Sequence, residues 1–341
     1  MHVRTKNMSS SLPRTLRLVL TAGAVITSAP AFGASDSAHI ERNNWSFGGL
    51  FGQFEEAQLR RGFQVYQEVC TSCHGLKRVY FRNLVQPGGP RFPEESVKAL
   101  AASWPNQIHD GPNDNGEIAD KKGNLIKRPA RLADPMLGPY DNDNQARAAQ
   151  NGALPPDLSL IARARNVEYE GSIAYHPVSM LKDIATAYQE GGADYLYALL
   201  TGYAAVPPAY ARDKSGQLTL VADKDVKDEK SVERCATIAK GENGAADVCN
   251  KLQDGMYYNK YFPGGQIAMP PPFSSPVKYQ ENAGATASVE QNAKDLSAFL
   301  SWTADPKLSE RKRIGWQVLL YLIITTVLLY VAKKRIWKSA H

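Results

Sequence analysis

Two of the four cysteines stand three positions apart, and a histidine directly follows the second, in the run Cys70, Thr71, Ser72, Cys73, His74. Cys-x-x-Cys-His is the attachment motif of c-type haem. Two intervening residues place both sulfurs on one side of a helical turn, where they can form thioethers to the two haem vinyl groups. The adjoining imidazole then faces the iron. The motif predicts one covalent haem c, bound through Cys70 and Cys73 and ligated by His74.

Two other interpretations of a Cys-x-x-Cys pair are less well supported. A zinc site needs a second Cys-x-x-Cys or a histidine pair at finger spacing, and the sequence has neither. A thioredoxin-like redox pair needs a βαβ pattern around it. The surrounding residues do not carry that pattern.

Helical periodicity is found before the motif and near the end of the chain. Leu59, Phe63 and Tyr66 are spaced as on one helix face, so residues 54–69 predict a helix that leads into the cysteines. Residues 288–291 (SVEQ) read as a capping box that opens a second helix, with Val289, Ala293, Leu296 and Leu300 on one face. A first helix packed on a last one around a covalent haem is the plan of small cytochromes c.

The chain between these helices is rich in Gly, Pro, Asn and Asp, as in residues 86–90 and 110–116. This composition predicts long loops rather than a second regular domain. We therefore expect a mainly α fold with long loops: a class I cytochrome c-like haem domain with insertions, plus one C-terminal transmembrane helix.

An iron with one histidine ligand needs a sixth ligand or an open position. Met269 stands between Gly264, Gly265 and three prolines (270–272), which could hold a thioether loop against the haem. The residues alone leave the choice open. The other candidates are Met136, Met180, Met256, His39, His109 and His176.

Both ends of the chain carry membrane signals. Basic residues up to Arg17, an apolar run over 18–26 and small residues up to Ala34 are typical of a secretory signal peptide, so 1–34 is expected to be cleaved. A retained anchor is the alternative, but the run is well short of the roughly 20 residues that span a bilayer.

Near the other end, residues 314–332 contain no charge and predict a single transmembrane helix of about 28 Å. A basic flank (311–313) precedes the helix, and a basic tail (333–341) follows it. Because the signal peptide exports the body, we expect 35–310 on the periplasmic side of a bacterial inner membrane and the tail in the cytoplasm.

The formal charge of +6 comes from these ends. Residues 35–310 hold 29 Lys and Arg against 34 Asp and Glu. A nucleic-acid partner is therefore disfavoured, because phosphate binding needs a basic face on the folded part. An acidic body favours basic partners.

Further motifs, in matching order from about Trp45 to the C-terminus, resemble the cytochrome c1 family. They are RRGFQVY (60–66), NGALPPDLS (151–159) with Arg163 and Arg165, LLTGY (199–203), YFPG (261–264) with Met269, and RKRIG (311–315). The resemblance implies the haem-bearing, electron-transferring subunit of quinol to cytochrome c oxidoreductase, which is not an enzyme as an isolated chain. It also implies Met269 as the sixth ligand and Arg165 as the partner of a haem propionate.

The same resemblance implies the partners of the chain. They are cytochrome b and a Rieske iron-sulfur protein in a dimeric membrane complex, with a basic cytochrome c as electron acceptor. For docking this acceptor we expect acidic residues in two stretches: Asp110, Asp114, Glu117 and Asp120, then Asp134, Asp141 and Asp143. Ordinary solvated turn residues are the alternative for these acids.

Residues 166–189 and 213–254 look like insertions relative to shorter members of the family. The second contains Cys235 and Cys249, for which an oxidising compartment favours a disulfide.

Two other functions are weighed against this one. A membrane-tethered peroxidase would need an open sixth position, and the dihaem kind would need a second Cys-x-x-Cys-His, which is absent. A membrane-bound electron shuttle without a parent complex has the same motifs.

Overall fold

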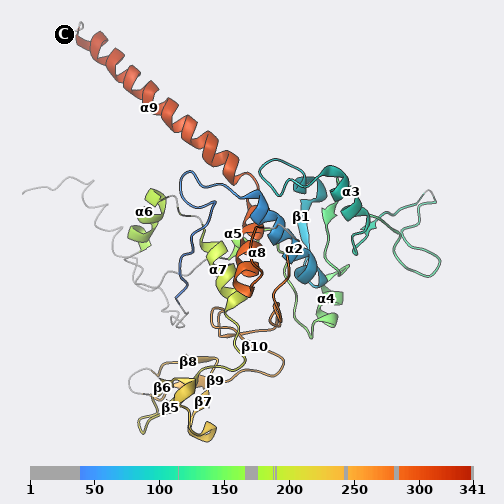
Figure 1. Cartoon of the computed structure of the whole chain (residues 1–341), viewed down its shortest axis with the longest axis vertical. Helices are drawn as coiled ribbons and strands as arrows, with labels where there is room; N and C mark the ends of the chain where they lie inside the picture. The colour runs from blue at the N-terminus through green and yellow to red at the C-terminus, as the bar shows by residue number, and fades with distance from the viewer. Residues whose placement is uncertain are drawn as a thin grey trace, which may run out of the picture. The chain divides into compact units, whose positions relative to one another are not determined.

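The computed structural model describes residues 39–113, 115–165, 176–186, 188, 190–241, 245–279 and 284–338. The predicted signal peptide, Asp114 and the side chain of His176 lie outside this part of the chain. Eight α-helices are found within it, joined mostly by long loops (Figure 1). They are α2 (Glu56–Val69), α3 (Glu94–Ala102), α4 (Asp143–Ala149), α5 (Ile161–Ala164), α6 (His176–Thr186), α7 (Gly191–Thr201), α8 (Val289–Ala304) and α9 (Leu308–Lys338). The mainly α prediction is confirmed.

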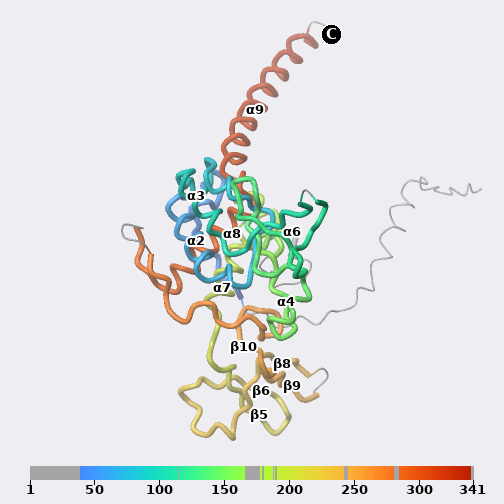
Figure 2. Tube along the Cα trace, turned by 90° about the vertical axis from the view of Figure 1, so that its right-hand side faces the viewer, coloured from blue at the N-terminus to red at the C-terminus, as the bar shows by residue number. Residues whose placement is uncertain are grey.

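The two helices predicted from periodicity pack against each other as α2 and α8, which lie side by side in both views (Figures 1 and 2). Leu59, Phe63 and Tyr66 of α2 are all buried, as their spacing indicates. The ring of Phe299 in α8 lies 5.6 Å from that of Phe63 and 5.9 Å from that of Tyr66, and Trp302 extends the cluster. This aromatic core fixes the end of α2, where the cysteines stand.

A buried ion pair also joins α2 to α8. Arg61 Nε donates to Asp295 Oδ2 at 2.7 Å, and the side-chain amides of Gln58 and Gln291 and the hydroxyl of Tyr279 donate to the same carboxylate. The buried Asp295 carboxylate is therefore bonded by four side chains, as an ion pair in an apolar core requires.

The N-terminus of α8 is capped as the sequence predicts, because the Ser288 side chain accepts from the backbone NH of Gln291 at 3.1 Å. The reciprocal half of the capping box is replaced. The Gln291 amide instead donates to Asp295, one turn further along the helix, at 2.9 Å.

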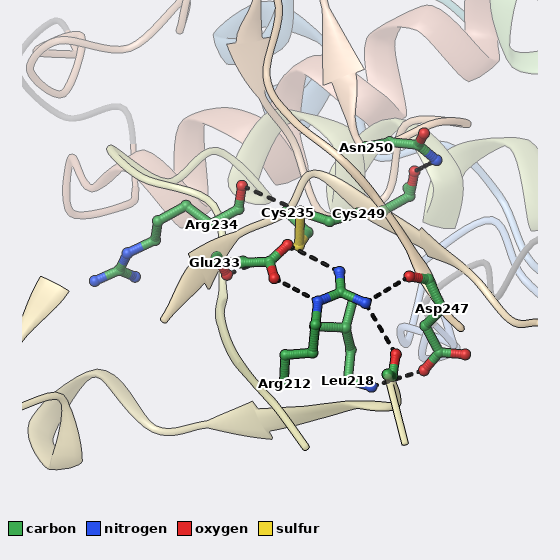
Figure 3. The surroundings of a disulfide bond; sticks show 10 residues. Arg212, Leu218, Glu233, Arg234, Cys235, Asp247, Cys249 and Asn250 are labelled. Atoms are coloured by element: carbon green, nitrogen blue, oxygen red, sulfur yellow. Dashed lines mark hydrogen bonds and ion pairs between the residues drawn. A yellow bond between two sulfur atoms is a disulfide. The ribbon is translucent and has the colours of Figure 1, made fainter. Parts of the chain in front are cut away.

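The second insertion is more regular than expected. Its strands β6 (Leu218–Val221) and β7 (Glu233–Arg234) flank β5 (Ala209–Arg212), which directly precedes the insertion, in a three-stranded antiparallel sheet. A hairpin of β8 (Thr237–Ala239) and β9 (Val248–Asn250) follows. A disulfide joins Cys235 to Cys249 (Figure 3). These strands are only two to four residues long, lie among the long loops that the composition predicts, and are stabilised by contacts distant in sequence.

Arg212 links the strands of this insertion. Its guanidinium donates to both carboxylate oxygens of Glu233, at 2.6 and 3.0 Å, and to the backbone carbonyl of Asp247 at 2.9 Å (Figure 3). The Asp247 carboxylate in turn accepts from the backbone NH groups of Leu218 and Gly241. A small cluster of charges thus replaces an apolar core.

The remaining strands are short pairs within the loops. β1 (Leu76–Tyr80) pairs with β4 (Pro135–Met136), β2 (Ile108–His109) with β3 (Lys127–Arg128), and β10 (Tyr257–Tyr258) with β11 (Gln266–Ile267).

The last helix, α9, is continuous over 31 residues, and its membrane-length apolar window is not buried in the protein. It is long and apolar enough to cross a membrane, as predicted for residues 314–332. The basic flank 311–313 belongs to the helix itself. At the start of α9, the Asp305 carboxylate accepts from Arg163 of α5 and from Arg311 Nη1 at 2.9 Å, so α5 and α9 meet at one side chain.

Candidate haem site

The two motif cysteines lie where α2 ends. Cys70 is the C-cap of α2 and begins a short 3₁₀ turn, with Cys73 NH and His74 NH both donating to the Cys70 carbonyl at 3.1 and 2.8 Å. Neither sulfur is in a disulfide. The fold therefore presents both thiols and the imidazole from one helical turn, as thioether attachment of a haem needs.

The chemistry of Cys70 fits a thioether better than a thiolate. Desolvation, together with the nearby Cys73, raises the pKa of the Cys70 thiol to about 12. Zinc-binding and redox-active cysteines act as thiolates. A thioether carries no charge, so a covalent haem is compatible with this half-buried position.

His74 is held in the orientation that an iron ligand requires. Its Nδ1 lies 2.7 Å from the carbonyl oxygen of Pro156, and because a carbonyl can only accept, Nδ1 carries the proton. Nε2 is therefore left with its lone pair for a metal. Burial lowers the pKa of His74, which favours the neutral ring that can ligate, although the bond to Pro156 acts in the opposite direction.

The segment that supplies the Pro156 carbonyl is itself fixed to the residues after the motif. Asp157 Oδ2 accepts from Lys77 NH at 2.8 Å, Leu158 NH donates to the Gly75 carbonyl at 2.9 Å, and Ser159 Oγ accepts from Arg78 NH at 3.0 Å. Residues 156–159 thus lie beside residues 74–78, although some 80 positions separate them. This explains the position of the NGALPPDLS motif in the fold.

A second chain segment approaches the motif from β4. A Cβ on Gly75 would lie 2.4 Å from the backbone nitrogen of Gly138, which no side chain allows. Glycine is required here because the two backbones touch directly after His74.

One contact of the site had no sequence signal. The Gln150 amide lies 3.6 Å from Cys73 Sγ and donates to the hydroxyl of Tyr140 at 2.7 Å. Gln150 stands just before the NGALPPDLS motif, and only the fold brings it to the cysteine.

The candidates for a sixth ligand differ in their surroundings. Met136 is fully buried in β4, paired with Leu76 of β1, so it is a core residue. Met180 is 58% exposed on α6, His39 is exposed, and His109 contacts Asp141. Met256 and Met269 are half-buried. The carbonyl of Met269 accepts from the hydroxyl of Tyr203 at 3.2 Å, which ties its loop to the end of α7.

Arg165 is the exposed C-cap of α5, and its Nη1 donates to the Ala164 carbonyl. Among the described residues, no hydrogen bond joins Arg165 or Met269 to the Cys70–His74 segment. Their predicted roles therefore remain predictions.

The acidic residues predicted for docking fall into two groups. Arg128 donates to Asp110 and Asp134, and Lys127 and His109 contact Asp141, so the charges of these three acids are compensated locally. In the described part of the chain no cation pairs with Glu117, Asp120 or Asp143. Glu117 and Asp120 accept from neighbouring Asn side chains.

Comparison with known proteins agrees with this geometry. The Cytochrome C1 family matches residues 45–340. The chain is 38% identical over 323 residues to "Cytochrome c1" of Blastochloris viridis, which covers 94% of each protein. It is 36% identical to "Cytochrome c1, heme protein, mitochondrial" of Saccharomyces cerevisiae, over 89% of this chain and 74% of that one.

A third relative is longer. "Cytochrome b/c1" of Bradyrhizobium diazoefficiens is 40% identical over 300 residues, and the match spans 88% of this chain but 36% of that protein. The residues matched by the family, 45–340, include the Cys70–His74 motif, α8 and α9. This chain therefore belongs to the cytochrome c1 family.

Proposed function

We propose that this chain is the membrane-anchored, monohaem c-type electron-transfer subunit of a quinol to cytochrome c oxidoreductase. The observation that carries the proposal is the contact of His74 Nδ1 with the Pro156 carbonyl beside two unpaired cysteines at the end of α2. The names of two relatives support the assembly: "Cytochrome b/c1" and "Cytochrome b-c1 complex catalytic subunit, mitochondrial".

Five residues would hold the haem. Cys70 and Cys73 form the thioethers, His74 and Met269 ligate the iron, and Arg165 pairs with a propionate. A haem held in this way supplies reversible one-electron exchange and has no vacant position for oxygen or peroxide. A methionine ligand favours the reduced state and raises the potential.

The surrounding residues have positioning roles. The Pro156 carbonyl fixes the ring and the tautomer of His74, and Asp157 and Ser159 fix the backbone that carries this carbonyl. The aromatic core between α2 and α8 holds the end of α2 in place. Little reorganisation is then needed when the charge at the site changes, which favours rapid electron exchange.

The membrane arrangement follows from the two ends of the chain. Residues 1–34 are removed as a signal peptide, 35–310 form the periplasmic haem domain, 314–332 cross the bacterial inner membrane after the basic flank 311–313, and 333–341 stay in the cytoplasm. Support comes from the continuous apolar helix α9, which is not buried in the protein. The anchor keeps the haem domain beside cytochrome b in a dimeric complex.

In this arrangement the domain accepts an electron from a Rieske iron-sulfur centre and passes it to a basic cytochrome c. The acidic balance of residues 35–310 supports such an acceptor. The complex would serve a proton-translocating respiratory or photosynthetic chain.

The test is purification of the protein from its membranes in mild detergent, with a reduced-minus-oxidised spectrum and a pyridine haemochrome count. We expect one haem per chain that stays on the chain in a denaturing gel, and co-purification of cytochrome b and an iron-sulfur protein. A Cys70→Ser, Cys73→Ser double variant should lose the covalent haem, whereas Cys235→Ser, Cys249→Ser should keep it.

Two results would contradict the proposal. A denatured parent chain without haem would exclude covalent attachment. A haem-bearing chain that always emerges alone would favour the orphan shuttle over a subunit of a complex.

A further inference from the structure

A short apolar loop precedes α2 in the chain and contacts the first turns of α9 in space. Residues 44–54 contain no charged side chain. The loop, residues 46–53, is closed by Gln53 NH donating to the Ser46 carbonyl at 3.0 Å. A Cβ on Gly52 would lie 2.0 Å from the Gly48 carbonyl oxygen, so the turn is tight and its tip is well defined.

The base and the tip of the 46–53 loop differ in burial. Phe47 is 2% exposed, and its ring lies 5.4 Å from that of Trp45 and 4.6 Å from that of Phe54, in a cluster that includes Leu308 of α9. At the tip, Leu50 is 47% and Phe51 64% exposed. Two large apolar side chains therefore face outward from a rigid base.

The start of α9 is attached to this same loop. Lys312 Nζ donates to the Phe47 carbonyl at 2.6 Å and lies 3.7 Å from Glu190, and both of these side chains are almost fully buried. Ser309 Oγ accepts from Phe54 NH at 3.1 Å. The helix thus leaves the haem domain at a fixed place.

The tip meets α9 beyond its last charged residue on this side. The rings of Phe51 and Trp316 are in edge contact, with centroids 5.6 Å apart and an interplanar angle of 79°. Trp316 comes three residues after Arg313, about 4.5 Å further along the helix axis. Phe51 therefore lies level with the uncharged part of α9, where an interfacial tryptophan is expected.

We infer that the tip of the 46–53 loop, with Leu50 and Phe51, inserts into the interfacial region of the lipid bilayer beside Trp316. This rests on the proposed function in one respect, that α9 spans the membrane. Exposed apolar side chains on a loop without charges of its own, continuous with a membrane-spanning helix, fit a lipid surface. Arg313, which is exposed, would stand at the level of the anionic headgroups.

The loop would give the domain a second point of contact with the membrane. One helix alone allows rotation and tilt of the domain above the bilayer. Two contacts, at the tip and at α9, fix the inclination of the Cys70–His74 segment to the membrane plane.

The test uses the full, haem-loaded chain in vesicles of phosphatidylcholine and phosphatidylglycerol. A cysteine is introduced as Phe51→Cys, labelled with a nitroxide, and its collision rates with oxygen and with a water-soluble nickel chelate are compared. Leu50→Cys is a second site that keeps the contact between Phe51 and Trp316. Ile118→Cys, 63% exposed in the loop 110–126, is the aqueous control, and Leu322→Cys in α9 is the lipid control.

We expect the ratio of oxygen to nickel accessibility at positions 50 and 51 to be several-fold higher than at 118 and below that at 322. Ratios at 50 and 51 equal to that at 118, with 322 in lipid, would overturn this inference alone. Shielding that arises only after cytochrome b is added would also overturn it, because the occupant would be a protein.

Two further results of this experiment test the proposed function separately. If the label at Leu322→Cys were as accessible to the nickel chelate as the label at position 118, α9 would not span the membrane, and the inference on the loop would fail as well. Label taken up by the parent chain would show free Cys70 or Cys73 and count against haem attachment, not against insertion of the loop.

Discussion

Gly62 of α2 and Asp295 of α8 are in direct backbone contact. A Cβ on Gly62 would lie 2.1 Å from the Asp295 carbonyl oxygen, and the same atom would lie 2.6 Å from Cβ of Phe299. No side chain can occupy that space. The crossing of the two helices that fixes the Cys70–His74 turn therefore depends on glycine at position 62.

Gly62→Ala should force α2 and α8 apart and lower the free energy of unfolding by about 1–3 kcal/mol, the usual cost of overpacking. Denaturant unfolding followed by circular dichroism measures this. Gly315→Ala is the matched control, since nothing lies within 4 Å of its added Cβ. Equal stability of Gly62→Ala and the parent would mean that the helices do not approach so closely.

The ion pair of Asp134 with Arg128 should make stability depend on pH. The two hydrogen bonds from Arg128, at 2.6 and 3.0 Å, lower the pKa of Asp134 despite its partial burial. The unfolded carboxyl titrates near pH 3.9, so the unfolded chain binds this proton first. The contribution is complete above that pH and is lost as the pH falls through the lower folded pKa.

Asp134→Asn should therefore destabilise the protein by about 1.5–3 kcal/mol at pH 7. When the pH is lowered below about 4, the stability of the variant should fall less than that of the parent. Unfolding titrations from pH 7 to 3 provide the comparison. Asp143→Asn, at an acid with no ion pair among the described residues, is the matched control. If the stability of Asp134→Asn fell with pH as steeply as that of the parent, the ion pair of Asp134 with Arg128 would not be the cause.

Replacing the proposed sixth ligand should change the redox potential and leave attachment intact. Met269→Leu should lower the midpoint potential on the order of 100 mV, within the roughly 0.8 V over which axial ligands act. Redox titration of the haem absorbance measures it. Met136→Leu, a volume-conserving change in the buried strand β4, should leave the potential unchanged; an unaltered potential in Met269→Leu would point to another ligand.

Docking of a basic cytochrome c should depend on the acids without local cations. Changing Glu117, Asp120 and Asp143 together to their amides should slow oxidation by such a cytochrome about three- to tenfold at low salt and flatten its salt dependence. Stopped-flow kinetics at several ionic strengths would test this.

The matched control alters the net charge equally at exposed acids outside that region: Glu41→Gln, Glu68→Gln and Asp225→Asn. If both triple variants behave alike, net charge rather than these three sites steers the encounter.

The disulfide should stabilise the second insertion locally. Cys235 and Cys249 are 14 positions apart, and closing a loop of that length contributes about 3 kcal/mol in the chain-entropy account. In the Cys235→Ser, Cys249→Ser variant, amide exchange should accelerate in β8 and β9 and remain slow in α2 and α8. An equal acceleration in both regions, or no acceleration in either, would mean that the insertion does not unfold separately.

The sequence predicted best what is local. Leu59, Phe63 and Tyr66 mark α2 because helix periodicity is short-range, and Ser288 marks the start of α8 because its cap spans three residues. The uncharged run in α9 was equally clear. The Cys70–His74 motif is local too, since its chemistry needs a single turn.

What the sequence did not reveal depends on contacts between distant residues. Pro156 is 82 positions from the ring that it orients, and only the folded backbone brings its carbonyl there. Arg61 and Asp295 are 234 apart. The strands of the second insertion escaped prediction because they are held by Arg212 and a disulfide rather than by alternating apolar residues. Of the acids predicted for docking, Asp110, Asp134 and Asp141 are paired with Arg128 or Lys127, which the sequence does not reveal because these pairs form only in the fold.

The meeting of Arg163 and Arg311 at Asp305 has a mechanical consequence. The link between α8 and α9 is three residues long. Its first residue, Asp305, accepts hydrogen bonds from Arg163 of α5 and from Arg311 of α9. Such a connection is rigid rather than flexible. The haem domain would then keep a fixed height above the bilayer, so its electron-transfer partners would have to move to reach it.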